Sequence, residues 1–153
     1  MQAGELAVDF PAITADSSAV AAVRKLVSER LPGLIVVEDG KPVTALPAYQ
    51  VARFLVPLYM RVDPALARVV AERHADQLCA RLVGKQVRDL LPEGRWEPLV
   101  VRAGETVMQV AELMERAHSP LVAVVGEDGT LLGAITLFEL LDATLRELSD
   151  SRG

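Results

Sequence analysis

Apolar and polar residues follow the same order twice along the chain. In each copy a hydroxyl residue, Ser18 or Thr106, precedes apolar residues that recur every three to four positions, as in an amphipathic helix. A proline, Pro32 or Pro120, ends each helix and a continuous apolar run follows, which is typical of a strand buried on both faces. An Asp-Gly pair then predicts a tight turn into a second strand, and a second amphipathic helix closes each copy.

The two copies give the same series of expected elements. Six strands are expected, three in each copy, over residues 12–14, 34–37 and 43–46, and over residues 99–102, 121–125 and 131–135. The closing helices are expected over residues 48–55 and 137–145. The sequence therefore predicts an α/β fold of the α+β type, built from two strand–helix–strand–strand–helix units.

The separation between the copies is constant as far as the Asp-Gly turn. It is 88 residues from Ser18 to Thr106 and from Pro32 to Pro120, and it becomes 89 after the turn. A period this long indicates a two-copy module, because the repeats of solenoids are roughly 20–50 residues long. Thr106 and Gln109 also have the spacing of a capping box at a helix start.

A different pattern separates the copies. Asp63 and Pro64 predict a helix start. An apolar stripe then runs to Gly84, interrupted at His74, and comprises Leu66, Val69, Val70, Leu78 and Leu82. We therefore expect a first unit over residues 1–56, a helical linker over 57–85 and a second unit over 86–153, which together form one module.

Composition narrows the class of protein. The chain has 153 residues, of which 51% are hydrophobic, and Cys79 is its one cysteine, so neither a disordered chain nor a disulfide framework is expected. No uncharged apolar run approaches the ~18 residues of a membrane span, and no signal peptide is evident, so we expect a cytoplasmic protein without membrane insertion. The net charge of −5 argues against nucleic acid as a partner.

The order of the motifs resembles a tandem pair of cystathionine-β-synthase (CBS) domains, also called a Bateman module. The second copy carries most of the resemblance: residues 87–91 look like the opening segment of such a domain, and residues 119–124 look like its second strand. Residues 128–136 look like its hairpin, which runs into residues 137–141. With the first copy included, the resemblance covers nearly the whole chain apart from the linker.

The resemblance implies a regulatory module without chemistry of its own. Two CBS domains of this family pair about a pseudo-twofold axis, and their cleft offers two related sites. In many members these sites bind AMP, ADP, ATP or S-adenosylmethionine. Such modules often form homodimers and report ligand state to an enzyme, channel or transporter. We therefore expect a stand-alone, non-enzymatic protein that forms a homodimer and signals to a separate effector.

The family's ligand signature falls on Gly133, Thr136 and Glu139 of the second copy. A hydroxyl and free N–H groups at a helix start suit a phosphate, and a carboxylate three residues later suits the ribose hydroxyls. Gly133 removes a side chain where a ligand would approach the backbone. Two features favour another interpretation: Thr136 and Glu139 also form a capping box, and Glu139 replaces the family's Asp.

The segment before the second strand supplies two more candidates. The resemblance places His118 and Ser119 near the base of the ligand, and a histidine contact would make binding depend on pH between about pH 5 and 8. The first copy departs further from the signature, with Thr44, Pro47 and Gln50 at its three positions. Pro47 offers neither hydroxyl nor N–H, so we expect at most one nucleotide site per chain.

Two alternatives remain at this point. The degenerate first copy and Glu139 favour a ligand-free structural or interaction protein that dimerises through the same fold. A small enzyme would need a site around His74 or His118. The chain has no phosphate-binding glycine loop, and His74 and Cys79 offer too few ligands for zinc, so no metal site and no catalytic residue are expected.

Overall fold

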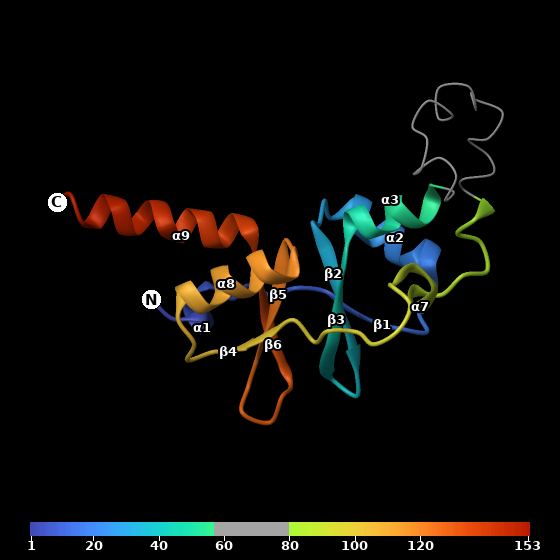
Figure 1. Cartoon of the computed structure of the whole chain (residues 1–153), viewed down its shortest axis with the longest axis horizontal. Coiled ribbons are helices and arrows are strands. Elements are labelled where there is room, and N and C mark those ends of the chain that lie inside the picture. The colour runs from blue at the N-terminus through green and yellow to red at the C-terminus, as the bar shows by residue number, and fades with distance from the viewer. Residues whose placement is uncertain (57–79) are drawn as a thin grey trace, which may run out of the picture.

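A computed structural model of the chain describes residues 1–56 and 80–153, and within them it contains two sheets that lie side by side (Figure 1). Helices of both units lie along one side of the sheets, and the hairpin tips point to the opposite side. Most of the expected linker helix, with His74 and Cys79, lies outside the described residues. Its expected end is described: residues 81–84 form a turn in which Gly84 has φ +77° and Leu82 is buried.

The first unit has the expected order of elements. These are β1 (Ala12–Thr14), α2 (Ala19–Ser28), β2 (Gly33–Glu38), β3 (Lys41–Pro47) and α3 (Ala48–Leu55). Strand β2 lies between β1, to which it is parallel, and β3, to which it is antiparallel. Ser18 is the N-cap of α2, where its hydroxyl accepts from the Ala21 N–H at 3.3 Å. The hydroxyl residue before the apolar stripe therefore begins the helix, as the sequence predicts.

The second unit repeats this arrangement. Its elements are β4 (Val100–Arg102), α8 (Val107–Ala117), β5 (Leu121–Val125), β6 (Leu131–Thr136) and α9 (Leu137–Asp150). Thr106 and Gln109 form the expected capping box at the start of α8. Helix α9 is five residues longer than predicted, and the ion pair between Asp142 and Arg146, one turn apart, supports the added turn. The α/β fold of two equivalent units is thus confirmed.

Backbone irregularities follow the same repeat. A register shift falls between Val36 and Val37 in the first sheet and between Val124 and Val125 in the second. Arg30 and His118, also 88 residues apart, have φ 51° and 50° at the ends of their helices. The backbone is therefore duplicated in detail, and not only in the order of its elements.

The hairpin turns explain the change of separation from 88 to 89 residues. The first turn has two central residues with positive φ, Asp39 and Gly40, as expected for a tight hairpin. The second turn is longer: Gly126 donates its N–H to the Thr130 carbonyl at 3.0 Å, and Gly129 carries the positive φ. Asp128 stabilises this loop by accepting from the Thr130 hydroxyl, a hydrogen bond that lowers the pKa of the Asp128 carboxyl.

Two short helices exchange places between the units. Helix α1 (Ala3–Leu6) lies against the second unit, where the Ala3 N–H donates to the Glu105 carbonyl at 2.8 Å. Helix α7 (Val87–Leu90) lies against the first unit, where the Val87 N–H donates to the Ser17 carbonyl at 2.9 Å. Each unit is therefore completed by the short helix that precedes the first strand of the other unit (Figure 1).

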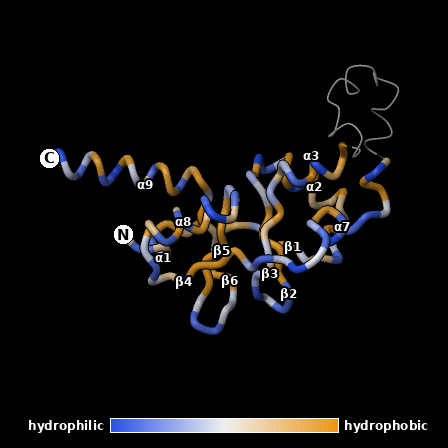
Figure 2. The backbone as a smooth tube through the Cα atoms, in the orientation of Figure 1, coloured by the Kyte–Doolittle hydropathy of each residue, from blue (hydrophilic) through white to orange (hydrophobic). Residues whose placement is uncertain are grey.

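Two hydrophobic cores meet between the sheets, whose strands are mostly apolar (Figure 2). Strand β2 contributes to both: Leu34 and Val36 belong to the core of the first unit, and Ile35 belongs to that of the second. A Cβ at Gly33 would lie 2.7 Å from the Leu121 Cδ2 atom. Gly33 and Leu121 are 88 residues apart, so equivalent positions of the repeat meet at the contact between the units.

Among residues 1–56 and 80–153, no helix combines the length and the apolar character needed to cross a bilayer.

Candidate functional site

Two hollows lie where the units meet. The larger, about 430 Å³, is lined by the segment before β1 and the end of α2 in the first unit and by β6 of the second; we call it the Gly133 hollow. Its lining residues are Asp9, Phe10, Pro11, Glu29, Leu131, Leu132 and Gly133. The smaller, about 230 Å³, is lined by β3 and the start of α3, by the segment before β4 and by the end of α8; we call it the Trp96 hollow.

The two hollows occupy equivalent places in the repeat. Pro11 and Glu29 of the Gly133 hollow correspond, at 88 residues, to Leu99 and Ala117 of the Trp96 hollow. Gly133 corresponds in the same way, at 89 residues, to Thr44. Each hollow thus combines the end of a helix from one unit with the hairpin of the other. The structure thus has two hollows that are related by the repeat.

Thr136 and Glu139 contact each other at the start of α9. The Thr136 N–H donates to Glu139 Oε2 at 2.8 Å, and the Thr136 hydroxyl donates to the same oxygen. The Glu139 N–H in turn donates to Thr136 Oγ1 at 3.5 Å. This is the capping box that the sequence offers as the alternative to ligand contact. Neither side chain lines the Gly133 hollow or the Trp96 hollow.

Gly133 is closely approached by the N-terminal segment of the chain. A Cβ at Gly133 would lie 2.7 Å from the Val8 carbonyl oxygen. Val8 and the neighbouring Ala134 exchange two backbone hydrogen bonds, of 2.9 and 3.0 Å. The missing side chain at Gly133 therefore makes room for the Val8 backbone, in addition to lining the hollow.

His118 and Ser119 lie close to the start of α9, because Leu121 pairs with Thr136 in the sheet and the Leu137 N–H donates to the Pro120 carbonyl at 2.8 Å. His118 is exposed, and its carbonyl accepts from the Tyr49 hydroxyl at 3.2 Å across the contact between the units. Ser119 is buried, and its hydroxyl donates to the Leu121 carbonyl at 2.6 Å. Ser119 lines the Trp96 hollow, and both residues line an adjoining apolar groove. The structure thus places Ser119 in the same hollow as residues 44–50 of the first copy. It places Gly133 in the same hollow as Glu29, at the end of α2.

Sequence reasoning missed the residues that give the Trp96 hollow its character. Trp96 is half-buried, and its indole N–H donates to the Pro92 carbonyl at 3.2 Å, which holds the ring in place. Arg95 is exposed beside it, and Tyr49 lines the wall formed by α3. The only tryptophan of the chain, adjacent to an arginine, was the signal available in the sequence.

The positions of the first-copy signature also face this hollow. Thr44, Pro47 and Gln50 all line it. The Gln50 carboxamide nitrogen donates to the Leu90 carbonyl at 3.2 Å, and this contact ties α3 to α7. The carboxamide oxygen of Gln50 is an acceptor, and the Thr44 hydroxyl is both donor and acceptor. The hollow therefore offers polar groups beside an aromatic wall.

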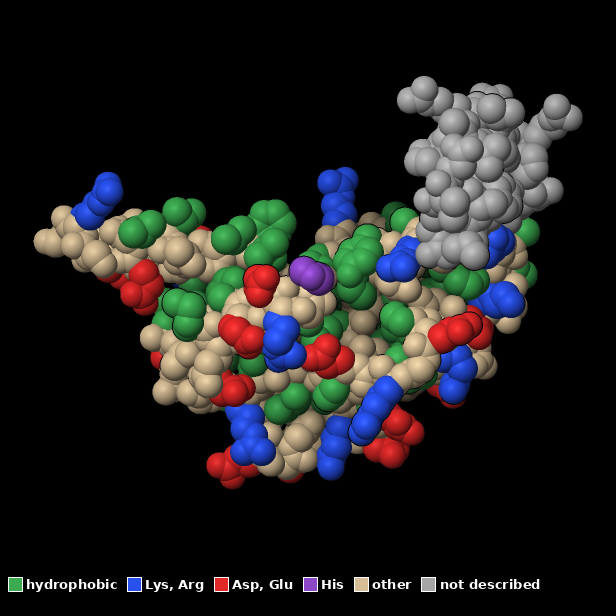
Figure 3. All heavy atoms as spheres, in the orientation of Figure 1, with side chains coloured by type: hydrophobic (Ala, Val, Ile, Leu, Met, Phe, Trp, Pro, Cys, Tyr) green, Lys and Arg blue, Asp and Glu red, His purple; other side chains and the backbone are tan. Residues whose placement is uncertain are grey.

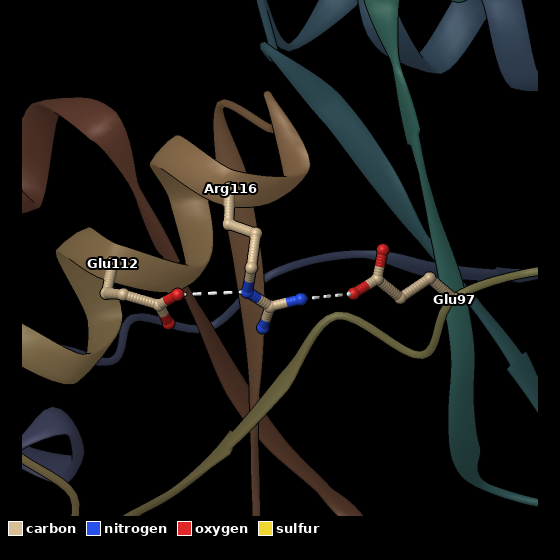
Figure 4. A network of polar contacts seen from close by, with 3 residues as sticks. All are labelled: Glu97, Glu112 and Arg116. Atoms are coloured by element: carbon tan, nitrogen blue, oxygen red, sulfur yellow. Dashed lines mark hydrogen bonds and ion pairs between the residues drawn. The ribbon is translucent and has the colours of Figure 1, made fainter.

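The charges of the two hollows differ. Glu97 lines the Trp96 hollow, and its carboxylate pairs with Arg116 at 3.1 Å, while Arg116 also pairs with Glu112 at 2.9 Å (Figure 4). Glu112 first, and then Glu97, hold the pKa of the Arg116 guanidinium above its ordinary value. In the Gly133 hollow, Asp9 and Glu29 are acidic and none of the described lining residues is basic.

Within residues 1–56 and 80–153, no three His, Cys, Asp or Glu side chains are grouped so that they could hold a metal ion.

Comparison with known proteins gives the class of this fold. The family model for the CBS domain matches residues 87–146. A crystal structure of a CBS domain-containing protein of unknown function from Kribbella flavida is 49% identical, with 95% of this chain and 99% of that chain covered and a TM-score of 0.78. No curated protein matches the chain. The chain therefore belongs to the CBS-domain family, and the tandem pair predicted from its sequence is confirmed.

Two more distant structures have the same fold. CBSX2, a CBS-pair protein from Arabidopsis thaliana, is 21% identical, with 97% of this chain and 96% of that chain covered and a TM-score of 0.73. A structure of CBSX2 in complex with AMP is 22% identical over 95% of this chain and 96% of that chain, with a TM-score of 0.67.

Proposed function

We propose that this CBS pair is a regulatory module that binds an adenine nucleotide, and that the Trp96 hollow is its site. The observation that supports this proposal most strongly is that Trp96, Arg95 and Glu97 line one hollow between the units. The Glu97 carboxylate is paired with Arg116. The complex of the structurally similar CBSX2 with AMP supports the choice of ligand class.

The side chains of the Trp96 hollow suit the three parts of a nucleotide. An aromatic wall stacks a base, and such stacking is worth about 1–3 kcal/mol per base. The Gln50 oxygen and the Thr44 hydroxyl can accept from ribose hydroxyls. Arg95 offers the planar donor geometry that phosphates prefer. The ion pair with Arg116 partly offsets the charge of the Glu97 carboxylate, which would otherwise oppose a phosphate.

The Gly133 hollow is less suited to the same ligand. Asp9 and Glu29 place two carboxylates at its edge, and like charges repel a phosphate. The sequence assigns ligand contact to Thr136 and Glu139, whose polar atoms are engaged with each other. Contact between these two residues and a ligand remains a prediction, and the experiment below tests it beside the Trp96 hollow.

Trp96 serves as its own reporter, because it is the only tryptophan in the chain. Titration with AMP, ADP, ATP or S-adenosylmethionine should change its fluorescence with saturation, and calorimetry should give one site per chain. Trp96→Ala should weaken binding by about 5- to 150-fold, as loss of base stacking implies. The matched variant Trp96→Tyr keeps an aromatic face and should bind within a few-fold of the parent.

The outcomes separate the two hollows. Two equal sites per chain would contradict the assignment of a single site. Loss of binding in Thr136→Val/Glu139→Ala, with Trp96→Ala unaffected, would place the ligand in the second copy instead. Ligand-induced thermal stabilisation rises with concentration by mass action, so a thermal-shift panel of the same ligands supplies an independent measurement.

A second candidate function is an interaction protein that needs no ligand. The observation that favours it is the capping box of Thr136 and Glu139. In it the polar groups of these two signature residues bond to each other instead of to a ligand. The absence of any fluorescence, calorimetric or thermal response to the nucleotides would select this function. In either case we expect the regulated protein to be a separate chain.

A further inference from the structure

A third hollow, of about 290 Å³, lies at the C-terminal ends of β1 and β2 in the first unit; we call it the Arg88 hollow. Its polar and aromatic lining residues are Thr14, Asp16, Glu38, Asp39, Arg88 and Trp96. Among these residues, only Trp96 also lines the Trp96 hollow. The Trp96 ring is therefore a wall common to two hollows whose other polar residues differ.

The segment that carries Trp96 is longer than its counterpart in the first copy. Five residues, 7–11, join α1 to β1, whereas nine residues, 91–99, join α7 to β4. The longer segment places the Trp96 ring against the core of the first unit. It therefore supplies the Arg88 hollow with an aromatic wall that the repeat alone does not provide.

Arg88 occupies a position at which the second unit has a glycine. The Arg88 N–H donates to the Ala15 carbonyl, and the Gly4 N–H donates to the Ala103 carbonyl, both at 2.9 Å. Ala15 and Ala103 are 88 residues apart, so α7 and α1 make the same backbone contact with equivalent positions of the two units. The fold forms this contact without a guanidinium in the second unit, and the contact therefore does not account for the Arg88 side chain.

The Arg88 hollow presents charges of both signs. Arg88 is the one basic residue among its described lining residues, and the Arg88 Nε donates to Gln86 Oε1 at 2.9 Å. Asp16 Oδ1 accepts from the Thr14 hydroxyl at 2.5 Å. This hydrogen bond first, and the nearby charge of Arg88 to a smaller extent, lower the pKa of the Asp16 carboxyl. Asp16 therefore carries its negative charge beside Arg88, whereas the equivalent residue of the second unit is Gly104.

Two more carboxylates lie at the end of β2 and in the turn that follows it. Glu38 and Asp39 are both exposed, and both line the Arg88 hollow. Figure 3 shows acidic and basic side chains close together over the part of the first unit that carries α7 and the β2–β3 hairpin. In the described parts of the chain, no group of acidic side chains is arranged to hold a metal ion, so these carboxylates are better suited to an organic cation.

We propose that the Arg88 hollow binds a free basic amino acid, of the class of lysine and arginine. The planar guanidinium of Arg88 suits the α-carboxylate of such a ligand, and the carboxylates suit its α-ammonium group. The face of Trp96 attracts the side-chain cation. Three carboxylates against one guanidinium favour a ligand with a net positive charge over a phosphate. The volume lies near the lower end of the ~300–1,000 Å³ of small-molecule sites, as expected for a ligand of amino-acid size.

A series of ligands tests the role of each charge. Lysine is titrated into the parent protein in the absence of nucleotide, so the outcome does not depend on the function proposed for the Trp96 hollow. Calorimetry should show saturable binding, and Trp96 fluorescence should change with it. Norleucine lacks the side-chain ammonium and cadaverine lacks the α-carboxylate, so each should bind at least about tenfold more weakly than lysine. If neither lysine nor arginine binds with a dissociation constant below about 1 mM, the proposal is wrong.

Two exposed substitutions locate the site. Arg88→Gln should weaken lysine binding by about tenfold or more, and it should not weaken cadaverine binding because cadaverine has no carboxylate. Asp39→Asn should weaken the binding of both ligands, and it keeps the hairpin because Asn-Gly also favours a two-residue turn. Asp128→Asn makes the same change in the turn of the second unit and is the matched control, with unchanged affinity. Equal losses of lysine and cadaverine binding in Arg88→Gln, or equal affinities of the two asparagine variants, would overturn the proposal, provided that circular dichroism shows the variants to be folded.

Discussion

The Trp96 hollow and the Gly133 hollow differ in chemistry although they occupy equivalent positions. Both join the end of a helix from one unit to the hairpin of the other. One is lined by an aromatic ring, an arginine and a paired carboxylate, and the other by two carboxylates and a glycine against which Val8 packs. The backbone repeat therefore fixes where a ligand could sit, and the side chains decide which of the two positions suits a nucleotide.

The largest effect on stability is expected at Leu121, which packs against its repeat equivalent Gly33. Leu121 is fully buried at the contact between the units. Leu121→Ala should lower the free energy of unfolding by about 2–5 kcal/mol, because it removes buried methyl groups and leaves a cavity. Chemical denaturation followed by circular dichroism measures this loss. A change below about 1 kcal/mol would show that the contact between the units is not tightly packed.

Paired glycine substitutions compare the two sheets. Gly33→Ala would place a Cβ 2.7 Å from the Leu46 carbonyl oxygen, and Gly133→Ala would place one 2.7 Å from that of Val8. Each should destabilise the fold by about 1–3 kcal/mol through overpacking. Gly104→Ala is the control, because its Cβ would meet no atom within 4 Å. Equal melting temperatures for all three variants would contradict the close approaches.

A substitution in the capping box of α9 distinguishes a role of Thr136 in stability from a role in ligand binding. Thr136→Ala should lower the free energy of unfolding by about 1 kcal/mol, because the Glu139 N–H loses its acceptor at the helix start. If the Trp96 hollow holds the nucleotide, the affinity of this variant stays within about twofold of the parent. A parallel loss of affinity in calorimetry would assign Thr136 to the ligand as well as to the helix.

The smallest effect is expected at Arg116. Arg116→Gln removes two exposed ion pairs, with Glu97 and Glu112, and because exposed pairs contribute little, the melting temperature should hardly change. Glu97 then keeps an uncompensated charge in the Trp96 hollow, and nucleotide affinity should fall a few-fold at low salt and less at high salt. Glu112→Gln is the control, since it leaves the pair between Arg116 and Glu97 intact. Equal nucleotide affinities for both variants would argue against this electrostatic role.

Local patterns in the sequence predicted the fold well. Ser18, Thr106 and Thr136 begin helices as expected, and β1, β5 and α3 have the predicted bounds. These features depend on neighbours within a few residues, such as a hydroxyl before an apolar stripe. The slip from 88 to 89 residues was likewise visible in the sequence, because Asp-Gly pairs mark both turns.

Contacts between distant segments could not be predicted in this way. The bonding of Ala3 to Glu105 and of Val87 to Ser17 depends on how the units face each other, which no local pattern encodes. One signal was present: Gln2 and Glu5 have the same spacing as Gln86 and Asp89, and both pairs form capping boxes. The Trp96 hollow was missed for the same reason, because its walls come from three separate parts of the chain.

The reciprocal placement of α1 and α7 makes the two halves of the polypeptide depend on each other for completion. A protease cut between residues 57 and 79 would yield two fragments, each holding a helix that fills the core of the other. Ala3 and Leu6 of the first fragment are buried in the core of the second unit, and Val87 and Leu90 of the second fragment are buried in the core of the first. The nicked protein should therefore hold together without a covalent link, and separately expressed fragments should complement each other as a split protein.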